Sequence, residues 1–255
     1  MIVSLVIPIY NEEKIITDTI MTVKEFMANN FDSDKSELDY EVIFVNDGSR
    51  DNTLKITQDF TDDKIKVLTH DENKGKGGAV RTGMLKATGD IIFFTDCDLA
   101  YGLDVLVEAC NLFRENKDAD VLIGSRKLHK EGYKSYNFMR KFASIAFFEF
   151  LRVYGGIKVS DSQSGFKGFR KTACKKIFSV CGINGWAFDF EVLLTAQKLD
   201  MKIIEMPIKI INHHDSKINL IKDSLKMLKD IAYIKKSVKK KFKGEDKHER
   251  EKTHI

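Results

Sequence analysis

The sequence predicts an α/β fold with a mostly parallel central sheet. Short β-branched or apolar runs alternate with segments of helical periodicity in the first half of the chain, and this alternation is typical of parallel sheets covered by helices on both faces. With 255 residues, 43% of them hydrophobic, the chain can form one large domain with a sizeable core. No apolar run reaches the roughly 20 residues of a membrane-spanning helix.

Strands are predicted from these runs over residues 2–9, 40–45, 65–69, 91–95 and 121–124. A helix to about Ala28 follows the first strand, with Asn11 as its predicted N-cap. Further helices are expected to begin near Thr53 and Asn73 and to cover 105–113. Ligands of such sheets bind at the carboxyl ends of the strands. The polar residues that fall at these ends are Asn11, Asp47, Asn73, Asp96 and Asp98.

Asp96 and Asp98 are the candidate metal ligands. They end an apolar run at a spacing of two residues, and side chains alternate faces along an extended backbone. Both carboxylates are therefore expected on one side, and Cys97 on the other, where it packs. Paired carboxylate oxygens suit Mg²⁺ or Mn²⁺, in particular a cation that also holds the phosphates of a nucleotide. A surface turn that closes a strand is the alternative interpretation.

The segment 73–83 places glycines at a predicted helix start. Free N–H groups at a helix N-terminus attract phosphate, and glycine lets the backbone approach a ligand closely. The segment lacks the G-K-[ST] of a Walker loop, and Val80 stands where a dinucleotide fingerprint has its third glycine. This disfavours a P-loop ATPase and a Rossmann dehydrogenase. A phosphate-binding turn and a purely structural tight turn both remain open.

Charge and cysteine content indicate the cellular compartment in which the protein is expected. Lysine and arginine outnumber aspartate and glutamate by 42 to 38, and the basic excess falls late in the chain. The four cysteines show no C-x-x-C spacing, and no charged leader with a cleavage site precedes the first strand. We therefore expect a reduced, cytoplasmic protein without structural zinc, whose contact with a membrane is peripheral.

Several motifs occur together in the order found in glycosyltransferase family 2, which the chain resembles over about residues 2–235. These motifs are Val6–Glu13, Val45–Thr53, Asn73–Gly83 and Gly89–Asp98. The later segments Gly124–Arg126, Asp161–Lys167 and Trp186–Glu191 are similar to those of dolichyl-phosphate glucosyl- and mannosyltransferases. The Trp-Ala-Phe-Asp sequence that begins at Trp186, followed by Ser216–Asn219, most resembles the dolichyl-phosphate β-glucosyltransferase branch.

The resemblance implies a nucleotide-diphospho-sugar transferase fold of the Rossmann-like GT-A type, and it assigns the donor site. Asp47 is expected to bind the nucleoside beside the turn Tyr10–Glu12, and Asp96 and Asp98 to hold a Mg²⁺ or Mn²⁺ ion that bridges the diphosphate. The residues that it places against substrate on this side are Pro8, Tyr10, Asn11, Glu12, Asp47, Asn73, Gly75, Lys76, Asp96 and Trp186.

The acceptor site follows from the chemistry of a phosphate nucleophile. A lipid monophosphate has a second pKa of about 6, is largely dianionic at neutral pH, and can attack an anomeric carbon without a protein base. It needs cationic placement, and the resemblance puts Arg126, Arg140 and Ser144 around its phosphate. A solvated residue at a helix start is the alternative for Arg140. Gln163 is expected in the acceptor and sugar loop, or as a structural hydrogen-bonding residue.

Asp189 completes the catalytic candidates, which are Arg126, Arg140 and Asp189. The resemblance makes Asp189 the base of family members that use hydroxyl acceptors. In the polyprenyl-phosphate branch it is expected to orient a sugar hydroxyl or the lipid phosphate. His213 and His214 either contact the diphosphate or the metal, or are solvated loop residues.

The predicted catalytic domain covers residues 1–218, and the tail 244–255 is expected to be disordered. Between them, a basic amphipathic helix is expected over 219–243, where lysines accompany apolar residues at helical spacing. Such a helix is attracted to an anionic membrane surface by about 1 kcal/mol per lysine. The alternative is an ordinary surface helix. The apolar segment 142–154 is too short to span a bilayer, and either is a buried helix or lies at the membrane surface.

The predicted function is metal-dependent, inverting transfer of glucose from UDP-glucose to the phosphate of a polyprenyl phosphate, dolichyl or undecaprenyl, at the cytoplasmic face of a membrane. Mannose transfer from GDP-mannose is the nearest alternative. A non-catalytic nucleotide-sugar binder, from a different class, would bind the donor without releasing nucleotide. The lack of a Q-x-x-R-W segment disfavours a processive polysaccharide synthase, and the lack of an aromatic-rich RNP-like strand disfavours nucleic-acid binding.

Overall fold

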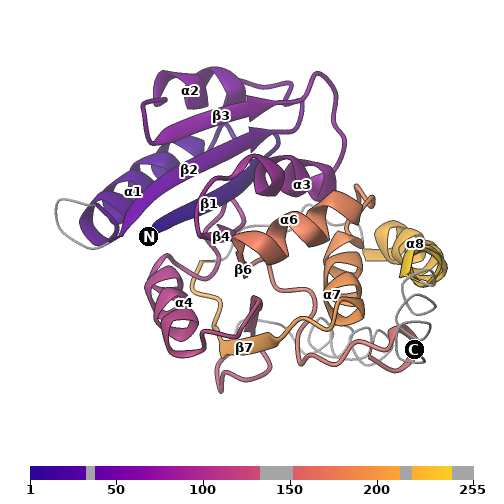
Figure 1. Ribbon diagram of the computed structural model, residues 1–255. Coiled ribbons are helices and arrows are strands. Elements are labelled where there is room, and N and C mark those ends of the chain that lie inside the picture. Colours follow the sequence, from indigo (N-terminus) through magenta and orange to yellow (C-terminus); the bar gives the residue numbers. More distant parts are fainter. Residues whose placement is uncertain (33–37, 133–151, 213–219, 243–255) are drawn as a thin grey trace, which may run out of the picture.

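The computed structural model describes residues 1–32, 38–132, 152–212 and 220–242 (Figure 1). Its strands are β1 Ile2–Ile9, β2 Asp39–Asn46, β3 Ile65–Thr69, β4 Ile91–Phe94, β5 Val121–Ser125, β6 Lys167–Arg170 and β7 Ile203–Pro207. They form one seven-stranded sheet in the order β3-β2-β1-β4-β6-β5-β7. All neighbouring strands are parallel except that β6 runs antiparallel to both β4 and β5. The predicted mostly parallel α/β sheet is confirmed.

Helices cover both faces of this sheet (Figure 1). They are α1 Ile16–Asn30, α2 Thr53–Asp59, α3 Lys76–Lys86, α4 Asp104–Glu115, α6 Lys171–Val180, α7 Phe188–Lys198 and α8 Leu220–Phe242. Alternation along the strands divides the core in two. Val3, Leu5 and Ile7 of β1 pack with α1 and α4, whereas Val6 packs with α3, α6, α7 and α8 on the other face.

The chain direction places a ligand site at one edge of the sheet. The chain builds β1, β2 and β3 outward on one side and then returns to β4 on the other side of β1. The strand order therefore reverses between β1 and β4, which is where open α/β sheets bind ligands, beyond the carboxyl ends of the strands. The register aligns these ends, since Ile9 pairs with Asn46 and Val6 pairs with Phe94.

The prediction that Asn11 is the N-cap of the first helix is wrong. Helix α1 begins at Ile16 with Ile15 as its N-cap. Asn11 has a φ of +53°, in the left-handed region that asparagine tolerates better than most residues. Its side-chain oxygen accepts the N–H of Arg50 at 2.8 Å, and its own N–H donates to Ser49 Oγ at 3.0 Å. Asn11 thus joins the turn after β1 to the turn after β2 instead of starting a helix.

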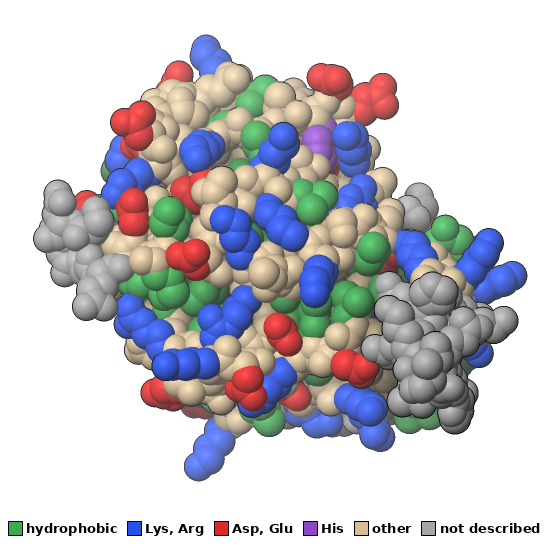
Figure 2. Space-filling model, in the orientation of Figure 1, with side chains coloured by type: hydrophobic (Ala, Val, Ile, Leu, Met, Phe, Trp, Pro, Cys, Tyr) green, Lys and Arg blue, Asp and Glu red, His purple; other side chains and the backbone are tan. Residues whose placement is uncertain are grey.

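Helix α8 lies where the basic amphipathic helix over 219–243 is predicted, and its apolar side is used within the protein. Ile231, Ile234 and Val238 are at most 1% exposed and belong to the core cluster that includes α7. Figure 2 shows Lys and Arg side chains gathered at the edge of the molecule that α8 forms. Within the described parts of the chain, none of the helices combines the length and apolar character that crossing a bilayer requires. The predicted tail 244–255 and most of the segment 142–154 lie outside the described residues.

Candidate active site

Asp47, directly after β2, is the centre of several hydrogen bonds on the side of the site where the sequence predicts the donor. Its carboxylate accepts the N–H groups of Lys74 at 2.9 Å and Gly75 at 2.8 Å. The ring nitrogen Nδ1 of His70 lies 2.7 Å from Oδ1 of Asp47, and its Nε2 lies 2.9 Å from the hydroxyl of Thr82. Asp47 is only 3% exposed. A nucleoside that contacts this carboxylate, as the sequence predicts, must therefore share it with these internal partners.

The glycines before and inside α3 allow close packing. Gly75 has a φ of +96°, which favours glycine, and a Cβ there would lie 2.6 Å from the carbonyl oxygen of Asn184. That same oxygen accepts the N–H groups of Gly77 at 2.8 Å and Gly78 at 3.3 Å. The first amides of this helix therefore have partners inside the chain. The tight-turn interpretation accounts for these glycines, and phosphate binding by Gly75 stays a prediction.

Asp96 and Asp98 follow β4 at the point where the strand order reverses. Oδ1 of Asp96 lies 2.5 Å from Nζ of Lys76 in α3, and Oδ1 of Asp98 accepts the N–H of Ala100 at 3.1 Å. Cys97 between them is 5% exposed and belongs to the core cluster on the α1 side, which confirms its predicted packing role. The two carboxylates are partly exposed and the thiol between them is buried, although this segment is a turn beyond β4 and not the extended chain that the sequence predicts.

Gly165 brings a second chain segment against Asp96. A Cβ at this position would lie 2.1 Å from Oδ2 of Asp96, so only glycine permits the approach. The N–H of Gly165 donates to the hydroxyl of Tyr101 at 3.3 Å. The segment 160–167, which leads into β6, is thereby held directly beside the acidic pair.

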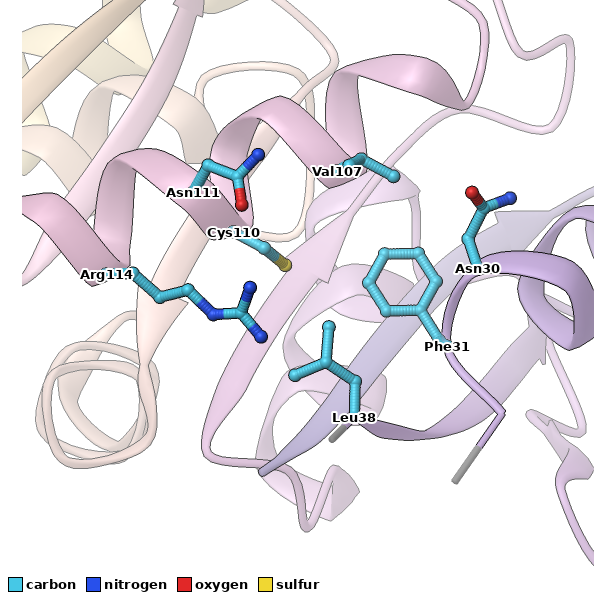
Figure 3. A pocket seen from close by; sticks show the side chains of 7 residues that line it. All are labelled: Asn30, Phe31, Leu38, Val107, Cys110, Asn111 and Arg114. Carbon is cyan, nitrogen blue, oxygen red and sulfur yellow. The ribbon is translucent and has the colours of Figure 1, made fainter. Parts of the chain in front are cut away.

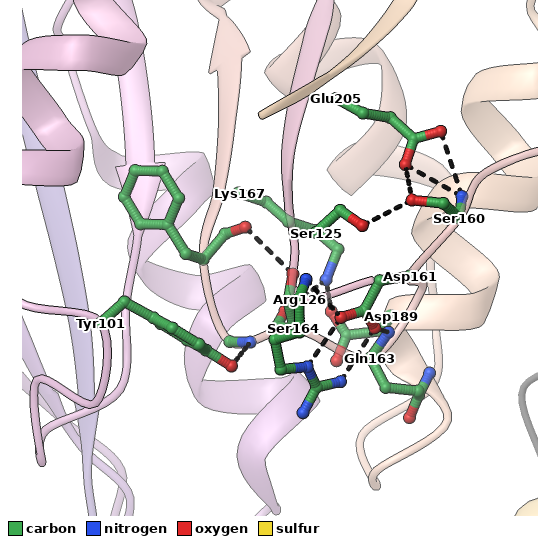
Figure 4. A network of polar contacts seen from close by, with 12 residues as sticks. Tyr101, Ser125, Arg126, Ser160, Asp161, Gln163, Ser164, Lys167, Asp189 and Glu205 are labelled. Carbon is green, nitrogen blue, oxygen red and sulfur yellow. Dashed lines mark hydrogen bonds and ion pairs between the residues drawn. The ribbon is translucent and has the colours of Figure 1, made fainter. Parts of the chain in front are cut away.

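Arg126, directly after β5, makes a bidentate ion pair with Asp161. Its Nε donates to Oδ2 at 2.7 Å and its Nη2 to Oδ1 at 2.8 Å, while its backbone N–H donates to Oδ2 at 3.1 Å (Figure 4). Burial on its own would raise the pKa of Asp161, but the Arg126 guanidinium lowers it below its usual range. Asp161 therefore fixes the planar fork of the arginine that the sequence predicts to hold the acceptor phosphate.

Asp189, the second residue of α7, pairs with a lysine that is fully buried. Nζ of Lys167 donates to Oδ1 of Asp189 at 2.5 Å and to the carbonyl oxygen of Ser164 at 2.7 Å (Figure 4). Burial raises the pKa of Asp189, and the positive charges of Lys167 and Lys76 oppose this rise. The carboxylate is therefore held in one orientation by an internal cation.

Two polar atoms next to these ion pairs lack partners. Ser162 Oγ and Gln163 Nε2 are buried and make no hydrogen bond to the described residues. Buried polar groups without partners are costly, and they are often explained by a ligand or a water molecule. A sugar hydroxyl or phosphate oxygen would be a suitable acceptor for Gln163 Nε2, and the place of this residue in an acceptor and sugar loop stays a prediction.

The structure gathers most of the predicted site residues at this edge of the sheet. From the strand ends and the start of α3 come Pro8, Tyr10, Asn11, Glu12, Asp47, Asn73, Gly75, Lys76, Asp96 and Asp98. Trp186 joins them from the segment before α7, with its ring centroid 5.4 Å from Nζ of Lys76. Arg140, Ser144, His213 and His214 lie outside the described residues.

Sequence reasoning missed Lys167 as an Asp189 partner, Asp161 as an Arg126 partner and His70 as an Asp47 partner. Lys167 and Asp161 are the two ends of the motif Asp161–Lys167. Two charged residues in this motif were the sequence signal that could have suggested ion-pair partners. His70 directly follows β3 and therefore falls at a strand end, the same signal that selects Asp47. None of these pairings is readable from local spacing, because the partners are 22 to 35 residues apart.

A separate pocket lies at the opposite edge of the sheet (Figure 3). Phe31, Leu38, Cys110 and Arg114 are among the residues that line it, near the C-terminal ends of α1 and α4. Leu38 directly precedes β2, so the pocket faces the amino ends of the strands. Burial raises the pKa of the Cys110 thiol to about 12, which makes it a poor nucleophile at neutral pH. The pocket lies at the opposite ends of the strands from Asp96 and Asp98.

An open α/β sheet with paired carboxylates, a lysine and an arginine beyond its strand ends has the arrangement of a ligand-binding site. Residues 4–178 match the sequence profile of glycosyl transferase family 2, and the chain belongs to that family of glycosyltransferases. It is 34% identical over 237 residues to a dolichyl-phosphate beta-glucosyltransferase of Trichomonas vaginalis, covering 90% of this chain and 69% of the relative. The dolichyl-phosphate beta-glucosyltransferase of Homo sapiens is 32% identical over 243 residues, covering 91% of this chain and 74% of the relative.

Solved structures show the same fold. Glucosyl-3-phosphoglycerate synthase from Mycobacterium tuberculosis, in complex with Mn²⁺, uridine diphosphate and phosphoglyceric acid, is 17% identical with a TM-score of 0.63, covering 92% of this chain and 78% of that one. A structure of that enzyme with Mg²⁺ and uridine diphosphate is 18% identical, also with a TM-score of 0.63, covering 89% of this chain and 76% of that one. The fold is therefore the GT-A type that the sequence predicts.

Proposed function

We propose that this enzyme transfers glucose from UDP-glucose to the phosphate of a polyprenyl phosphate, with inversion at the anomeric carbon and with Mg²⁺ or Mn²⁺ bound. The relatives that match nine-tenths of the chain are dolichyl-phosphate beta-glucosyltransferases. The observation that carries the proposal is that the segment 160–167 touches Asp96 through Gly165, anchors Arg126 through Asp161, and leads to Lys167. One segment thus links the carboxylates proposed for the donor to the arginine proposed for the acceptor.

The residues beside β4 fit a divalent cation. Asp96 already accommodates one cationic group, since the ammonium of Lys76 lies 2.5 Å from it. Among the described residues, no three or more His, Cys, Asp and Glu side chains form a closed metal site. A cation held by Asp96 and Asp98 would therefore take its other ligands from the diphosphate and water, as Mg²⁺ commonly does. When bound, it would supply neutralisation of the charge that develops on the departing nucleoside diphosphate.

The acceptor requires orientation more than it requires a base. An ionised phosphate oxygen has no proton to lose when it attacks the anomeric carbon, so the protein has to place it in line with the leaving diphosphate. The guanidinium of Arg126 is held rigidly by Asp161, and a rigid fork loses little entropy when it binds phosphate. Arg140 and Ser144 are proposed to complete this acceptor site. Gln163 is proposed to contact the sugar or the phosphate, and Asp189 to orient a sugar hydroxyl or the phosphate.

Peripheral attachment to the cytoplasmic face of a membrane is part of the proposal, since the acceptor carries a lipid chain. The exposed lysines Lys229, Lys236, Lys239 and Lys240 of α8 supply positive charge for an anionic surface. The catalytic domain is proposed to span 1–218, with α8 as the attachment element.

The direct test is transfer of labelled sugar into an organic extract. Purified protein is incubated with Mn²⁺, polyprenyl phosphate and one of a panel of labelled nucleotide sugars that includes UDP-glucose and GDP-mannose. We expect label in the organic phase from UDP-glucose, and transfer from GDP-mannose alone would replace glucose by mannose in the proposal. Nucleotide-sugar binding without transfer or nucleotide release would identify a non-catalytic binder. The double variant Asp96→Asn with Asp98→Asn should lose activity at least a hundred-fold, and Asp63→Asn, an exposed acid on a loop, serves as its control.

A further inference from the structure

Lys167 is a charged side chain in the middle of the sheet. It begins β6, where it pairs in register with Phe94 of β4 and Ile123 of β5, and it is 0% exposed. Its ammonium lies 5.4 Å from the ring centroid of Phe94 and bonds to Asp189 and to the carbonyl oxygen of Ser164. A buried charge is costly unless it is paired, and a buried ion pair adds little stability over an apolar replacement. Stability alone is therefore a weak reason for a lysine here.

The partner of Lys167 faces the donor side of the site. Asp189 follows Phe188, and the start of α7 packs on the start of α3 so closely that a Cβ at Gly77 would lie 2.5 Å from Cβ of Phe188. Lys76, at the start of α3, is bonded to Asp96 and also feels the charge of Asp189. The charge of Asp189 is therefore close enough to act on Lys76, one of the groups proposed to hold the diphosphate.

Hydroxyl and phosphate acceptors differ in whether they need this carboxylate as a base. When water or an alcohol attacks the anomeric carbon, a new C–O bond forms, the bond from that carbon to the diphosphate oxygen breaks, and the O–H proton must pass to a base. When an ionised phosphate attacks, the same bonds form and break, and no proton is transferred. The ammonium group of Lys167, 2.5 Å from Asp189, makes this buried carboxylate a weaker proton acceptor than the same buried carboxylate would be without that cation.

We propose that Lys167 determines acceptor specificity: by holding Asp189 in an ion pair, it weakens Asp189 as a proton acceptor for water or alcohols and so favours transfer to acceptors that arrive ionised. This inference rests on the proposed function, because it explains why a phosphate is the acceptor. Lys167 is a positioning residue, since it acts through Asp189 and is itself fully buried. The same ion pair would slow hydrolysis of the bound nucleotide sugar before the lipid acceptor binds.

The first arm of the test uses the unaltered protein. Labelled UDP-glucose, or whichever nucleotide sugar supports transfer, is offered with Mn²⁺ and either polyprenyl phosphate or the corresponding polyprenol. We expect the phosphate to be used at least a hundred-fold better than the alcohol. Equal use of the two acceptors would overturn the inference about Lys167. If neither acceptor is used, the proposed function fails, and the second arm alone decides the role of Lys167.

The second arm measures hydrolysis of the nucleotide sugar without any acceptor, per mole of folded protein. Lys167→Met removes the ammonium and keeps similar volume, and Lys167→Gln keeps a hydrogen-bond donor in case the first variant does not fold. We expect hydrolysis to rise at least ten-fold relative to the unaltered protein. Adding Asp189→Asn to either variant should return it to the starting level. Lys176→Met, the same change at an exposed position of α6, is the matched control.

A merely structural role for Lys167 gives a different pattern. Loss of structure lowers hydrolysis and transfer together and does not depend on whether residue 189 carries a carboxylate. Unchanged or reduced hydrolysis in folded Lys167→Met or Lys167→Gln protein, or a rise that persists after Asp189→Asn, would therefore refute the inference. Folding of each variant is followed by circular dichroism and by its thermal midpoint.

Discussion

The ammonium group of Lys76 lies 2.5 Å from Oδ1 of Asp96, so this carboxylate already holds a positive charge before any metal binds. Burial on its own would lower the pKa of Lys76, but the carboxylates of Asp96, Asp189 and Asp98 raise it, and the side chain is charged at neutral pH. A divalent cation at Asp96 would bind beside this ammonium group and be repelled by it. A diphosphate that arrives with the cation gives the ammonium group a new partner.

Metal binding without nucleotide should therefore improve when Lys76 loses its charge. For Lys76→Met we expect roughly ten-fold tighter Mn²⁺ binding to the protein alone, because one repelling charge is removed from the acidic pair, and weaker binding of UDP. Titration calorimetry with Mn²⁺, repeated with UDP present, measures both changes. Lys86→Met, at the exposed end of the same helix, should change neither. Equal Mn²⁺ affinity in Lys76→Met and the unaltered protein would contradict the prediction.

Acceptor binding should depend on Arg126, but a single substitution there is a poor test. Removing Arg126 alone leaves the Asp161 carboxylate, 2% exposed, without its cation, which costs about 3–5 kcal/mol. The double variant Arg126→Gln with Asp161→Asn removes both charges. We expect it to be more stable than Arg126→Gln alone, with KM for polyprenyl phosphate raised at least ten-fold and KM for UDP-glucose changed less than about two-fold.

The matched control for this pair is Lys202→Gln with Asp118→Asn. These two residues form an exposed ion pair at 2.7 Å on the outer part of the molecule. Exposed pairs add little stability, so neither the thermal midpoint nor either KM should change. An increase in the donor KM in place of the acceptor KM for the Arg126 double variant would show that the acceptor site has been assigned wrongly.

Local sequence patterns predict the first half of the fold well because each strand there is a clear apolar run. Residues 2–9 and 91–95 are β-branched or aromatic runs that end in polar turns, and both form buried strands. Strand β6 was not predicted, since Lys-Gly-Phe-Arg carries two charges and a glycine in four residues. The charge of Lys167 is paired with Asp189, which lies on a helix and is 22 positions away in the sequence. Such a pairing forms only in the folded structure, and no periodic pattern in the sequence indicates it.

The candidate site shows the same division. Asp96 and Asp98 were predicted as a pair on the assumption of an extended chain, whereas β4 ends at Phe94 and residues 97 and 98 lie in a turn. The binding of Lys76 to Asp96 and the capping of α3 by Asn184 could not be predicted, because each depends on how separate segments meet. Asn11 was predicted as an N-cap from its residue type and the acidic residues that follow it, but it has a left-handed φ and its N–H donates to Ser49, which is far away in the sequence.

Stability at acidic pH should depend on Glu41. Burial on its own would raise the pKa of this carboxyl group, but Lys66, Ser4 and Thr88 bind the ionised form and lower the pKa to about 2, from an ordinary value of 4.5. The resulting stabilisation is present above about pH 4.5 and is lost as the pH falls toward 2. Its size is roughly 3 kcal/mol.

Urea unfolding between pH 3 and pH 7 measures this contribution. We expect the unaltered protein to lose stability steeply below pH 4.5, and Glu41→Gln to be less stable at pH 7 with a flatter dependence on pH. The exposed Glu108→Gln on α4 should follow the curve of the unaltered protein. Parallel curves for Glu41→Gln and the unaltered protein would show that Glu41 is not the group responsible.

Membrane attachment should depend on the lysines of α8 and not on its apolar side. Truncation within α8 is uninformative, because Ile234 and Val238 are core residues. The triple variant Lys229→Gln, Lys236→Gln and Lys240→Gln leaves the buried side intact, and we expect it to weaken binding to anionic vesicles about a hundred-fold, by about 1 kcal/mol per lysine. Binding should also fall with added salt, because the attraction is screened.

The control triple Lys55→Gln, Lys86→Gln and Lys117→Gln removes equal charge from other exposed positions. Similar losses for both triples would show that net charge, and not α8, attaches the protein to the membrane.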